Sequence, residues 1–374
     1  AFETLGHSVN TIDTEIYRKD VTAKETLELV HTELSNSYYD FVFSINFYPI
    51  ISEVCNIHQV RYLCWIVDSP VLELFSKSLS NDWNRIFLFD TALLNDFQHY
   101  NPEHIFYLPL ACDVDDKQAS IAHASAAQQQ KFSHQISFIG SLYSEKNPYI
   151  YLKHTSEYMR GYLDSIMAVQ QKIYGAYLID DMITNDIIDY FDKNMSKKYI
   201  FPEKSNTDYK ALVSQYYIGT NITVLERTHL LKELSKIYDV DLYTYSDTSE
   251  LSDIHVHNGA NTITEMPVIF NKSQINLNLT SRPIRNGVPL RVWDVLGCAG
   301  FMLTNYQNDL FMHLTPGEHL DVYSSEEEFF DKISYYLSHP SLCREIAQNG
   351  YEFIKTNHNY TIRCDELISL AFSI

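Results

Sequence analysis

Residues 275–304 give the clearest indication of the fold and read I-N-L-N-L-T-S-R-P-I-R-N-G-V-P-L-R-V-W-D-V-L-G-C-A-G-F-M-L-T. Its two ends, 275–279 and 300–304, are short apolar runs of the kind that forms buried parallel strands. Between them, residues 290–296 carry apolar side chains at helical spacing, and Gly287 marks the preceding turn. A strand, a turn, a helix and a second strand predict one β-α-β unit.

The same alternation of short apolar runs and helical segments fills most of the chain. The further runs that predict strands are 7–12, 41–45, 60–67, 85–89, 105–108, 135–139 and 240–245. Thr22 and Glu25 have the spacing of a capping box and predict a helix at 22–35. Repeated β-α-β alternation with near-continuous apolar strands predicts parallel sheets that helices cover on both faces. We therefore expect two doubly wound α/β domains in tandem.

The expected domain boundaries follow from where this alternation stops. Small and polar residues fill 119–133, which separates a first domain at 1–118 from a second domain at 134–356. Residues 147–217 are Tyr-rich and helical in period, and we interpret them as a helical insertion in the second domain. The last residues, 357–374, are expected to form a helix that packs back on the first domain. Because the chain opens with a helix-like segment, we also expect the first strand of that domain to be missing.

The composition restricts the class of partner. The chain has 374 residues, with 28 basic and 48 acidic ones, which gives a net charge of −20. A surface this acidic repels phosphodiester backbones and anionic lipids, so we expect no nucleic-acid partner. The six cysteines form no CxxC pair, which indicates reduced thiols in a cytoplasmic protein. We find no run of 18 apolar residues, and we expect neither a membrane span nor a signal peptide.

Positive charge gathers in the middle of the stretch 275–304. Arg282, Arg285 and Arg291 lie within ten positions of one another on a chain that is otherwise strongly acidic. Pro289 fits the first turn of the following helix, where free backbone N–H groups and the helix dipole attract anions. The pattern therefore predicts a site for a phosphate-bearing ligand. The alternative is an ordinary β-α-β crossover with arginines on its surface.

Ten short motifs carry a family resemblance by their order and spacing. In chain order they are W-I-V-D-S-P at 65–70, F-L-F-D at 87–90, Y-L-P-L-A at 107–111, F-I-G-S at 138–141, E-M-P at 265–267, S-Q-I-N-L-N-L at 273–279, G-V-P-L-R-V-W-D-V-L-G at 287–297, G-E-H at 317–319, Y-Y-L-S-H-P at 335–340 and N-H-N-Y-T-I-R at 357–363. With these motifs the chain resembles the CgeB-like (spore-maturation-protein-like) glycosyltransferases. The resemblance implies a GT-B-type fold, in which two Rossmann-like domains face each other across a cleft.

The resemblance also implies a donor site on the second domain. Asp294 matches the position at which retaining GT-B enzymes bind the ribose of the nucleotide. Asn286 stands where those enzymes carry a glutamate, so the anomeric outcome of the reaction stays open. The donor-binding residues that we predict are Lys146, His257, Glu265, Arg282, Arg285, Asn286, Gly287, Val288, Leu290, Arg291 and Asp294.

A candidate catalytic residue lies in the first domain. Asp68 ends a buried strand, at the edge of the sheet where doubly wound domains bind their ligands. Its carboxylate is a candidate general base toward an acceptor hydroxyl. A second interpretation is that Asp68 caps the turn or helix that follows, as Asp before Ser-Pro often does. Asp90, at the end of another strand of the same domain, is the weaker candidate for the base.

Two short patterns have the ligand types of a metal site. Asp239 and Asp241 form an Asp-x-Asp pair, the pattern with which glycosyltransferases of the other fold hold a divalent cation. Because the pair follows a helix directly, we interpret it as turn chemistry at a strand entry. His255 and His257 have no further Cys or His at ligand spacing. We therefore expect no metal site and no cofactor.

These features predict a glycosyltransferase that moves a sugar from a nucleotide-diphosphate donor to a protein or glycan acceptor. Arginines and helix N–H groups stabilise the leaving diphosphate in place of a metal. Two alternatives stay open: a nucleotide-sugar epimerase or hydrolase on the same fold, and a catalytically silent protein that binds a nucleotide sugar or a partner. Asn286 keeps the silent alternative open, because it removes a carboxylate from the donor site.

Overall fold

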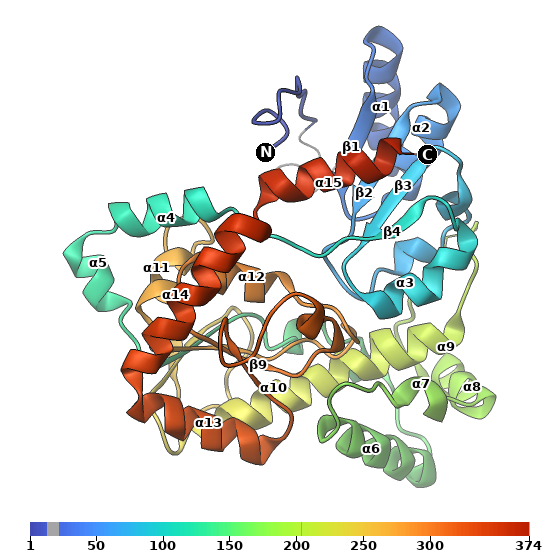
Figure 1. Ribbon diagram of the computed structural model, residues 1–374. Coiled ribbons are helices and arrows are strands. Elements are labelled where there is room, and N and C mark those ends of the chain that lie inside the picture. The colour runs from blue at the N-terminus through green and yellow to red at the C-terminus, as the bar shows by residue number, and fades with distance from the viewer. Residues whose placement is uncertain (13–21, 203, 374) are drawn as a thin grey trace. The chain divides into compact units, whose positions relative to one another are not determined.

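The computed structural model describes residues 1–12, 22–202 and 204–373, and Figure 1 shows the course of the chain. The chain divides into two compact units. The first consists of Ala1–Leu110, Ile200–Asp208 and Tyr360–Ile374, and the second of Ala111–Tyr199 and Tyr209–Asn359. The C-terminal helix therefore belongs to the same unit as the N-terminal part of the chain.

A four-stranded parallel sheet forms the centre of the first unit, in the order β1-β2-β3-β4. Its strands are β1 (Phe41–Ile45), β2 (Arg61–Trp65), β3 (Asn84–Leu88) and β4 (Ile105–Tyr107). Its helices are α1 (Ala23–Asn36), α2 (Pro49–His58), α3 (Thr91–Phe97) and α15 (Tyr360–Phe372), with the 3-10 helices η1 (Leu72–Phe75), η2 (Lys77–Ser80) and η3 (Gln98–Tyr100). Strand β3 is buried along its whole length, as an inner strand covered on both faces must be.

Local signals place the helices of this unit. Thr22 caps α1 in the predicted capping box with Glu25. Pro49 stands in the first turn of α2, where its missing N–H removes no hydrogen bond. Asp90 caps α3 by accepting a hydrogen bond from the backbone N–H of Ala92. These helix starts follow from the residues that occupy them.

The N-terminal residues do not add a strand to this sheet. We predicted a strand at 7–12, but these residues pair with none of the described strands. Asn10 instead donates a hydrogen bond to the side chain of Glu33. The prediction is wrong because the segment offers only Val9 and Ile12 for burial, and both remain exposed.

A six-stranded parallel sheet forms the centre of the second unit, in the order β10-β9-β8-β5-β6-β7. Its strands are β5 (Ile136–Ile139), β6 (Val240–Tyr243), β7 (His255–His257), β8 (Ile275–Asn278), β9 (Met302–Asn305) and β10 (Asp321–Tyr323). From β5 the chain builds outward to β7, then crosses back and builds outward on the other side to β10. The topological switch point therefore lies between β5 and β8, and open sheets bind ligands at the carboxyl ends of the strands at such a point.

Helices cover both faces of this sheet. Figure 1 shows α11 and α12 above β9, and α10 and α13 below it. Buried side chains of β5, β6, β8 and β9 pack with α10 and α13 into one apolar core. The helices of the unit are α4 (Val114–His123), α5 (Ala126–Lys131), α6 (Glu157–Gln171), α7 (Ile179–Met182), α8 (Asn185–Asn194), α9 (Tyr209–Ala211), α10 (Thr220–Ser235), α11 (Met266–Lys272), α12 (Leu290–Gly297), α13 (Glu326–Ser338) and α14 (Pro340–Asn357), with the 3-10 helices η4 (Ser144–Lys146), η5 (Pro148–Tyr151) and η7 (Asn308–Met312) and the π-helical segment η6 (Leu212–Gly219).

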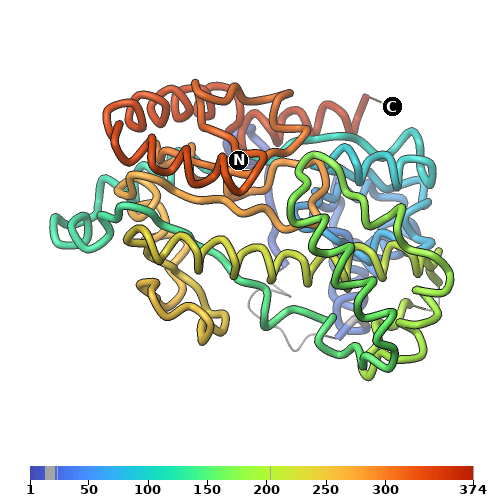
Figure 2. The backbone as a smooth tube through the Cα atoms, turned by 90° about the horizontal axis from the view of Figure 1, so that it is seen from below, coloured from blue at the N-terminus to red at the C-terminus, as the bar shows by residue number. Residues whose placement is uncertain are grey.

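The stretch 147–217, which we interpreted as a helical insertion, contains η5, α6 to α9 and most of η6. Figures 1 and 2 show α6 to α8 as a group of helices beside the N-terminal part of α10. Residues 200–208, between α8 and α9, belong to the first unit. Residues 119–133, which we expected to connect the domains, lie within the second unit and form part of α4 and all of α5. A capping box of Ser125 and Gln128 starts α5 and explains why this polar stretch is helical.

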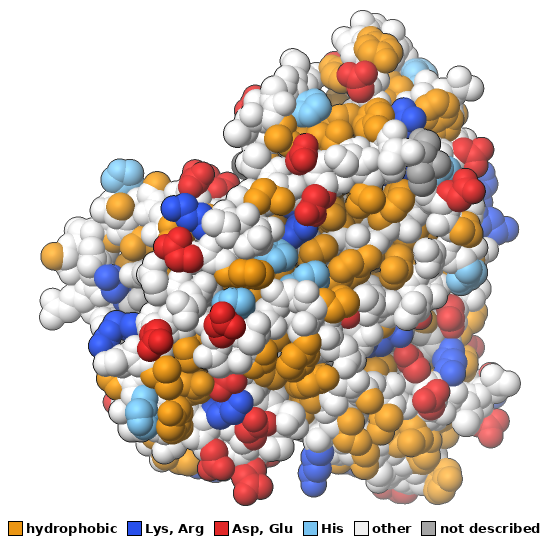
Figure 3. All heavy atoms as spheres, in the orientation of Figure 1, with side chains coloured by type: hydrophobic (Ala, Val, Ile, Leu, Met, Phe, Trp, Pro, Cys, Tyr) orange, Lys and Arg blue, Asp and Glu red, His pale blue; other side chains and the backbone are white. Residues whose placement is uncertain are grey.

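The prediction of an α/β fold with two parallel sheets is confirmed. Among the helices that the structure describes, none is long and apolar enough to cross a membrane. On the face that Figure 3 shows, Lys and Arg side chains lie singly or in small groups among acidic ones. Binding of an anion on this face therefore depends on individual basic side chains and not on a broad positive field.

Candidate functional site

The candidate site lies at the carboxyl edge of the second sheet, at the switch point between β5 and β8. The loop 140–147 follows β5 there, and the loop 279–289 follows β8 and leads into α12. Neighbouring parallel strands end at the same edge of a sheet, so these two loops lie side by side. Arg227 of α10 joins them directly, because its guanidinium donates hydrogen bonds to the carbonyl oxygens of Ser141 and Leu279.

Hydrogen bonds from the segment after β9 hold the loop that follows β8. Asn286 accepts one from Nδ2 of Asn308 at 2.7 Å, and the carbonyl of Gly287 accepts one from Nε2 of Gln307 at 3.0 Å. The carbonyl of Val288 accepts one from the indole N–H of α12 at 3.3 Å. The predicted donor residues of this loop therefore lie together in one ordered segment.

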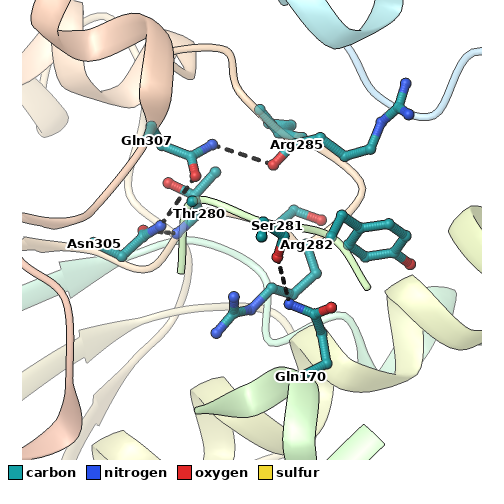
Figure 4. Close-up of a pocket in the computed structure, with 11 residues that line it drawn as sticks. Gln170, Thr280, Ser281, Arg282, Arg285, Asn305 and Gln307 are labelled. Atoms are coloured by element: carbon teal, nitrogen blue, oxygen red, sulfur yellow. Dashed lines mark hydrogen bonds between the residues drawn. The ribbon is translucent and has the colours of Figure 1, made fainter. Parts of the chain in front are cut away.

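A small polar pocket opens beside this loop (Figure 4). Its lining comes from the insertion and from the loops after β8 and β9, and consists of Gln170, Gly175, Ala176, Tyr177, Thr280, Ser281, Arg282, Ile284, Arg285, Asn305 and Gln307. Gln170 shapes the insertion side, because its amide donates to the carbonyls of Ile173 and Ala176. Figure 4 shows the side chains of Arg282 and Arg285 pointing away from each other. Two predicted donor residues, Arg282 and Arg285, thus line the same pocket, and each has its own interaction partners.

The guanidinium of Arg282 is buried and engaged inside the unit. It forms a bidentate ion pair with Glu226 of α10, at 2.6 Å from Nε and 2.7 Å from Nη2. It also stacks over the ring of Tyr174 and donates to the carbonyls of Gln171 and Ile173. Tyr174 donates its hydroxyl proton to the same carboxylate of Glu226. Arg282 therefore ties the insertion to α10 and to the loop after β8.

Arg285 lies on the other side of the pocket and pairs with Asp180 of α7, with 3.3 Å between Nη1 and the carboxylate. Ser214 donates its hydroxyl proton to the same carboxylate at 2.5 Å. Both members of the pair are largely buried, with side chains 11% and 29% exposed. The insertion therefore balances the charge of Arg285, and the attraction that remains for an anion is weaker than at an arginine without an acidic partner.

Arg291 forms no ion pair with any residue that the structure describes, unlike the two other predicted arginines. It stands in the first turn of α12, which begins at Leu290 after Pro289. Its guanidinium lies 5.2 Å from the ring centre of Phe270 and 3.8 Å from the sulfur of Met266. Burial lowers the pKa of Arg291, because these surroundings disfavour the charged form. A guanidinium in this position is suited to bind an anion.

Asp294, the predicted ribose ligand, lies one turn further along α12. Its Oδ1 pairs with the ammonium of Lys117 of α4 at 2.9 Å, and both side chains are mostly buried. Burial by itself would lower the pKa of Lys117, but the charge and the hydrogen bond of Asp294, together with interactions with Cys112 and Cys298, raise it.

The loop after β5 carries the other predicted basic residue, Lys146. Its ammonium group is exposed, makes no ion pair within the described chain, and lies 5.9 Å from the ring centre of Tyr143. Burial would raise the pKa of Glu145, but hydrogen bonds from the hydroxyls of Ser141 and Ser246 keep it below its usual value. Polar contacts thus order the loop after β5, and the ammonium group of Lys146 stays exposed.

Sequence reasoning missed a further basic residue at this edge, Arg227. It is 8% exposed, and its guanidinium lies 4.9 Å from the ring centre of Tyr143 and 5.5 Å from that of Phe138. Like Arg291, it forms no ion pair with a described residue. A signal for it was present in the sequence, because its helical spacing to the three buried leucines that follow in α10 places it on the same face.

The remaining predicted donor residues have internal partners. His257, at the end of the edge strand β7, binds Asp241 through Nε2 at 2.7 Å and stacks on Tyr243. Asp241 also binds His134 at 2.9 Å, so this half of the Asp-x-Asp pair is engaged within the unit. Glu265 accepts a hydrogen bond at 2.9 Å from the backbone N–H four residues earlier, just before α11. Nowhere in the described ranges do three or more His, Cys, Asp or Glu side chains form a group that could hold a metal ion.

Asp68 lies in the first unit, exposed just after the carboxyl end of β2. Asn46, directly after β1, donates a hydrogen bond to its carboxylate at 2.7 Å. The next helix, η1, begins after Val71 and has no side-chain cap, so Asp68 does not cap it. Asp90 is buried and caps α3. Of the two candidate bases, only Asp68 has a carboxylate that is open to solvent.

Comparisons with known proteins identify a similar family and similar solved structures. Residues 227–369 match a family model described as glycosyl transferase-like. A comparison with curated proteins finds no match. Among solved structures, the Anabaena protein HepE in complex with UDP-glucose is similar, with a TM-score of 0.55 and 8% sequence identity over 94% of this chain and 82% of that chain.

Two further solved structures are similar at the same level. Sucrose-phosphate synthase from Thermosynechococcus elongatus has a TM-score of 0.51 and 9% identity, over 94% of this chain and 78% of that chain. A glycosyltransferase from Rickettsia africae has a TM-score of 0.51 and 9% identity, over 98% and 84%. At such low identity the likeness concerns the fold. The chain thus has the two-sheet α/β architecture of GT-B glycosyltransferase structures, as predicted.

Proposed function

We propose that this protein is a CgeB-like glycosyltransferase that moves a sugar from a nucleotide-diphosphate donor to a protein or glycan acceptor. The observation that carries this proposal is Arg291, which stands in the first turn of α12 and forms no ion pair with a described residue. On a chain of net charge −20, such a guanidinium favours a ligand that brings negative charge, as a nucleoside diphosphate does. The glycosyl transferase-like match over 227–369 includes this residue, and HepE, which has a similar fold, is seen with UDP-glucose.

In this proposal the second unit binds the donor. Arg291 and Lys146 bind the diphosphate, since neither forms an ion pair with a carboxylate in the described structure. Asp294 binds the ribose through the carboxylate oxygen that Lys117 does not use. Glu265 and the backbone before it contact the base, and the ordered loop after β8 lies against the sugar.

The reaction needs a stabilised leaving group and a nucleophile that loses a proton. The bond between the anomeric carbon and the diphosphate oxygen breaks, and the nucleoside diphosphate leaves with its charge opposite Arg291 and Lys146. The acceptor oxygen forms the new bond to the anomeric carbon, and its proton passes to Asp68. Because side-chain cations stabilise the leaving group, we propose that the reaction needs no divalent metal.

A thermal-shift screen against UDP, GDP, CDP and dTDP sugars tests this proposal. We expect one class of nucleotide to raise the melting temperature, and we expect EDTA to leave that rise unchanged. Release of nucleoside diphosphate that depends on an added acceptor supports transfer. Donor breakdown without an acceptor would identify a hydrolase or epimerase, and binding without turnover across a broad acceptor panel would identify a silent binding protein. If no nucleotide stabilises the protein, the proposal is overturned.

The variants Arg291→Ala and Asp294→Ala should each weaken nucleoside-diphosphate binding at least tenfold. A hydrogen bond to a charged group contributes about 1.5–3 kcal/mol, and each variant removes such a group. Isothermal titration calorimetry measures the affinity. Arg344→Ala, which removes an exposed arginine on α14 of the same unit, is the matched control and should leave the affinity unchanged. Wild-type affinity in Arg291→Ala would remove that residue from the donor site.

A further inference from the structure

Arg227 of α10 is a buried cation whose hydrogen bonds all go to neutral partners. Arg227 is only 8% exposed. Nε donates to the carbonyl oxygen of Leu279 at 2.9 Å, and the terminal nitrogens donate to the carbonyls of Leu279 and Ser141. The rings of Tyr143 and Phe138 lie against the guanidinium. Each of these contacts stabilises the positively charged guanidinium, but none of them is made by a negatively charged group.

A buried charge without a counter-charge is unfavourable, so its presence needs an explanation. The buried guanidinium of Arg282 shows the usual arrangement, because the carboxylate of Glu226 neutralises it. Arg227 follows Glu226 directly in the chain, yet no described carboxylate pairs with it. Burial lowers the pKa of Arg227 the most, interactions with Tyr143 and Glu226 act against this, and the charge of Arg291 acts in the same direction as burial. Arg227 and Arg291 repel each other, and a bound anion would relieve that repulsion.

The position of Arg227 indicates the kind of anion. Its hydrogen bonds join the ends of β5 and β8, the two strands beside the switch point. Lys146 lies near the same Tyr143 ring as Arg227, at 5.9 Å and 4.9 Å from the ring centre respectively. Arg227, Lys146 and Arg291 are thus three cations at one edge of the sheet that form no ion pair with a described residue. A ligand with two linked phosphates brings the negative charge that such a group of cations favours.

We propose that Arg227 is a further donor-binding residue, which supplies a buried positive charge to the diphosphate and holds the two loops beside it. This inference rests on the proposed function and extends its donor site from α12 to α10. A guanidinium has five N–H donors, and the contacts with Leu279 and Ser141 occupy each nitrogen once. N–H groups on the two terminal nitrogens therefore remain for phosphate oxygens.

Two neutral variants, Arg227→Met and Arg227→Gln, test the proposal beside the charged variant Arg227→Lys. Gln keeps an amide donor for the two carbonyls, so it offers a second neutral protein if the Met variant does not fold. Calorimetry measures the affinities for nucleoside di- and monophosphates and for inorganic pyrophosphate, on proteins whose circular dichroism matches the wild type. We expect the neutral variants to lose at least tenfold in affinity for the diphosphate and pyrophosphate, and less for the monophosphate. Arg227→Lys should stay within about threefold of the wild type, because it keeps the charge but loses the fork of donors.

The matched control is Arg85→Met in the first unit. Arg85 is 6% exposed, and its guanidinium also donates to backbone carbonyls, those of Asp82, Asn84 and Ala371. Both Met variants should lower the melting temperature, but only Arg227→Met should change the affinity for nucleotides. If all Arg227 variants keep the wild-type preference for diphosphate over monophosphate, the residue is a structural tie between the loops and the inference is overturned.

The binding experiments also distinguish an error in the proposed function from an error in the role of Arg227. A wild-type protein that binds none of the nucleotides overturns the proposed function, and inorganic pyrophosphate then tests Arg227 separately. Stabilisation of the wild type but not of the neutral variants by pyrophosphate would support the anion-binding role. An equal thermal shift in the wild type and the neutral variants would overturn it.

Discussion

The Asp68→Asn variant should turn over its donor about 10²- to 10⁴-fold more slowly than the wild type and bind the donor equally well. Asp68 is exposed just after β2, and Asn46 holds its carboxylate at 2.7 Å. Asparagine has nearly the same shape and can accept the same hydrogen bond, but its neutral amide cannot take a proton from an acceptor hydroxyl. Release of nucleoside diphosphate measures turnover, and calorimetry measures donor affinity.

The control for this variant is Asp40→Asn. Asp40 is also an exposed carboxylate of the first unit, but it lies just before β1, at the opposite edge of the same sheet. Its replacement should leave turnover unchanged. A parallel loss of affinity and turnover in Asp68→Asn would contradict the role of base, because the residue would then contribute to binding. A turnover reduced by less than tenfold would show that another group accepts the proton.

The Glu226→Ala variant should lose about 3–5 kcal/mol of stability in the second unit, because it leaves the buried guanidinium of Arg282 without a counter-charge. The pair is bidentate, at 2.6 Å and 2.7 Å, and its side chains are only 8% and 7% exposed. Tyr174 also loses the acceptor of its hydroxyl proton. Hydrogen exchange of α6 and α10 measures the effect, since both helices belong to the second unit.

The double variant Glu226→Leu with Arg282→Met is the control for this prediction. It removes both charges and fills their space with apolar side chains, so it should recover most of the stability that Glu226→Ala loses. It should also leave nucleotide affinity near that of the wild type, since Arg282 is engaged inside the unit. Equal stability losses in the single and double variants would show that packing, and not the uncompensated charge, is what the pair contributes. A tenfold loss of nucleotide affinity in the double variant would return Arg282 to the donor site.

Much of the fold could be predicted because its signals are local. The apolar runs at 41–45 and 275–279 coincide with β1 and β8 to within one residue. Strands of parallel sheets are buried on both faces, so their residues are largely apolar and stand out in the sequence. The prediction of a strand at 7–12 is wrong. This segment has few apolar residues to bury, and it pairs with no strand in the described structure.

The position of the candidate site along the chain could be predicted, but the residues that are available to a ligand there could not. The turn before α12 and its arginines identified the place. The partners of those arginines lie far away in the chain, because Glu226 is 56 positions from Arg282 and Asp180 is 105 positions from Arg285. No local pattern encodes such pairs. The helical spacing of Arg227 predicts its burial, but its carbonyl partners after β5 and β8 meet only in the folded unit.

The class of fold, the position of the turn that attracts anions and the acidic character of the chain can all be derived from the amino-acid sequence. These properties depend on composition and on neighbours within a few positions. Which cations form ion pairs became visible only in the folded protein: Arg282 and Arg285 pair with carboxylates, whereas Arg291 and Arg227 form no ion pair with a described residue. Electrostatic energy depends on distance in space, and the order of residues along the chain does not contain that distance.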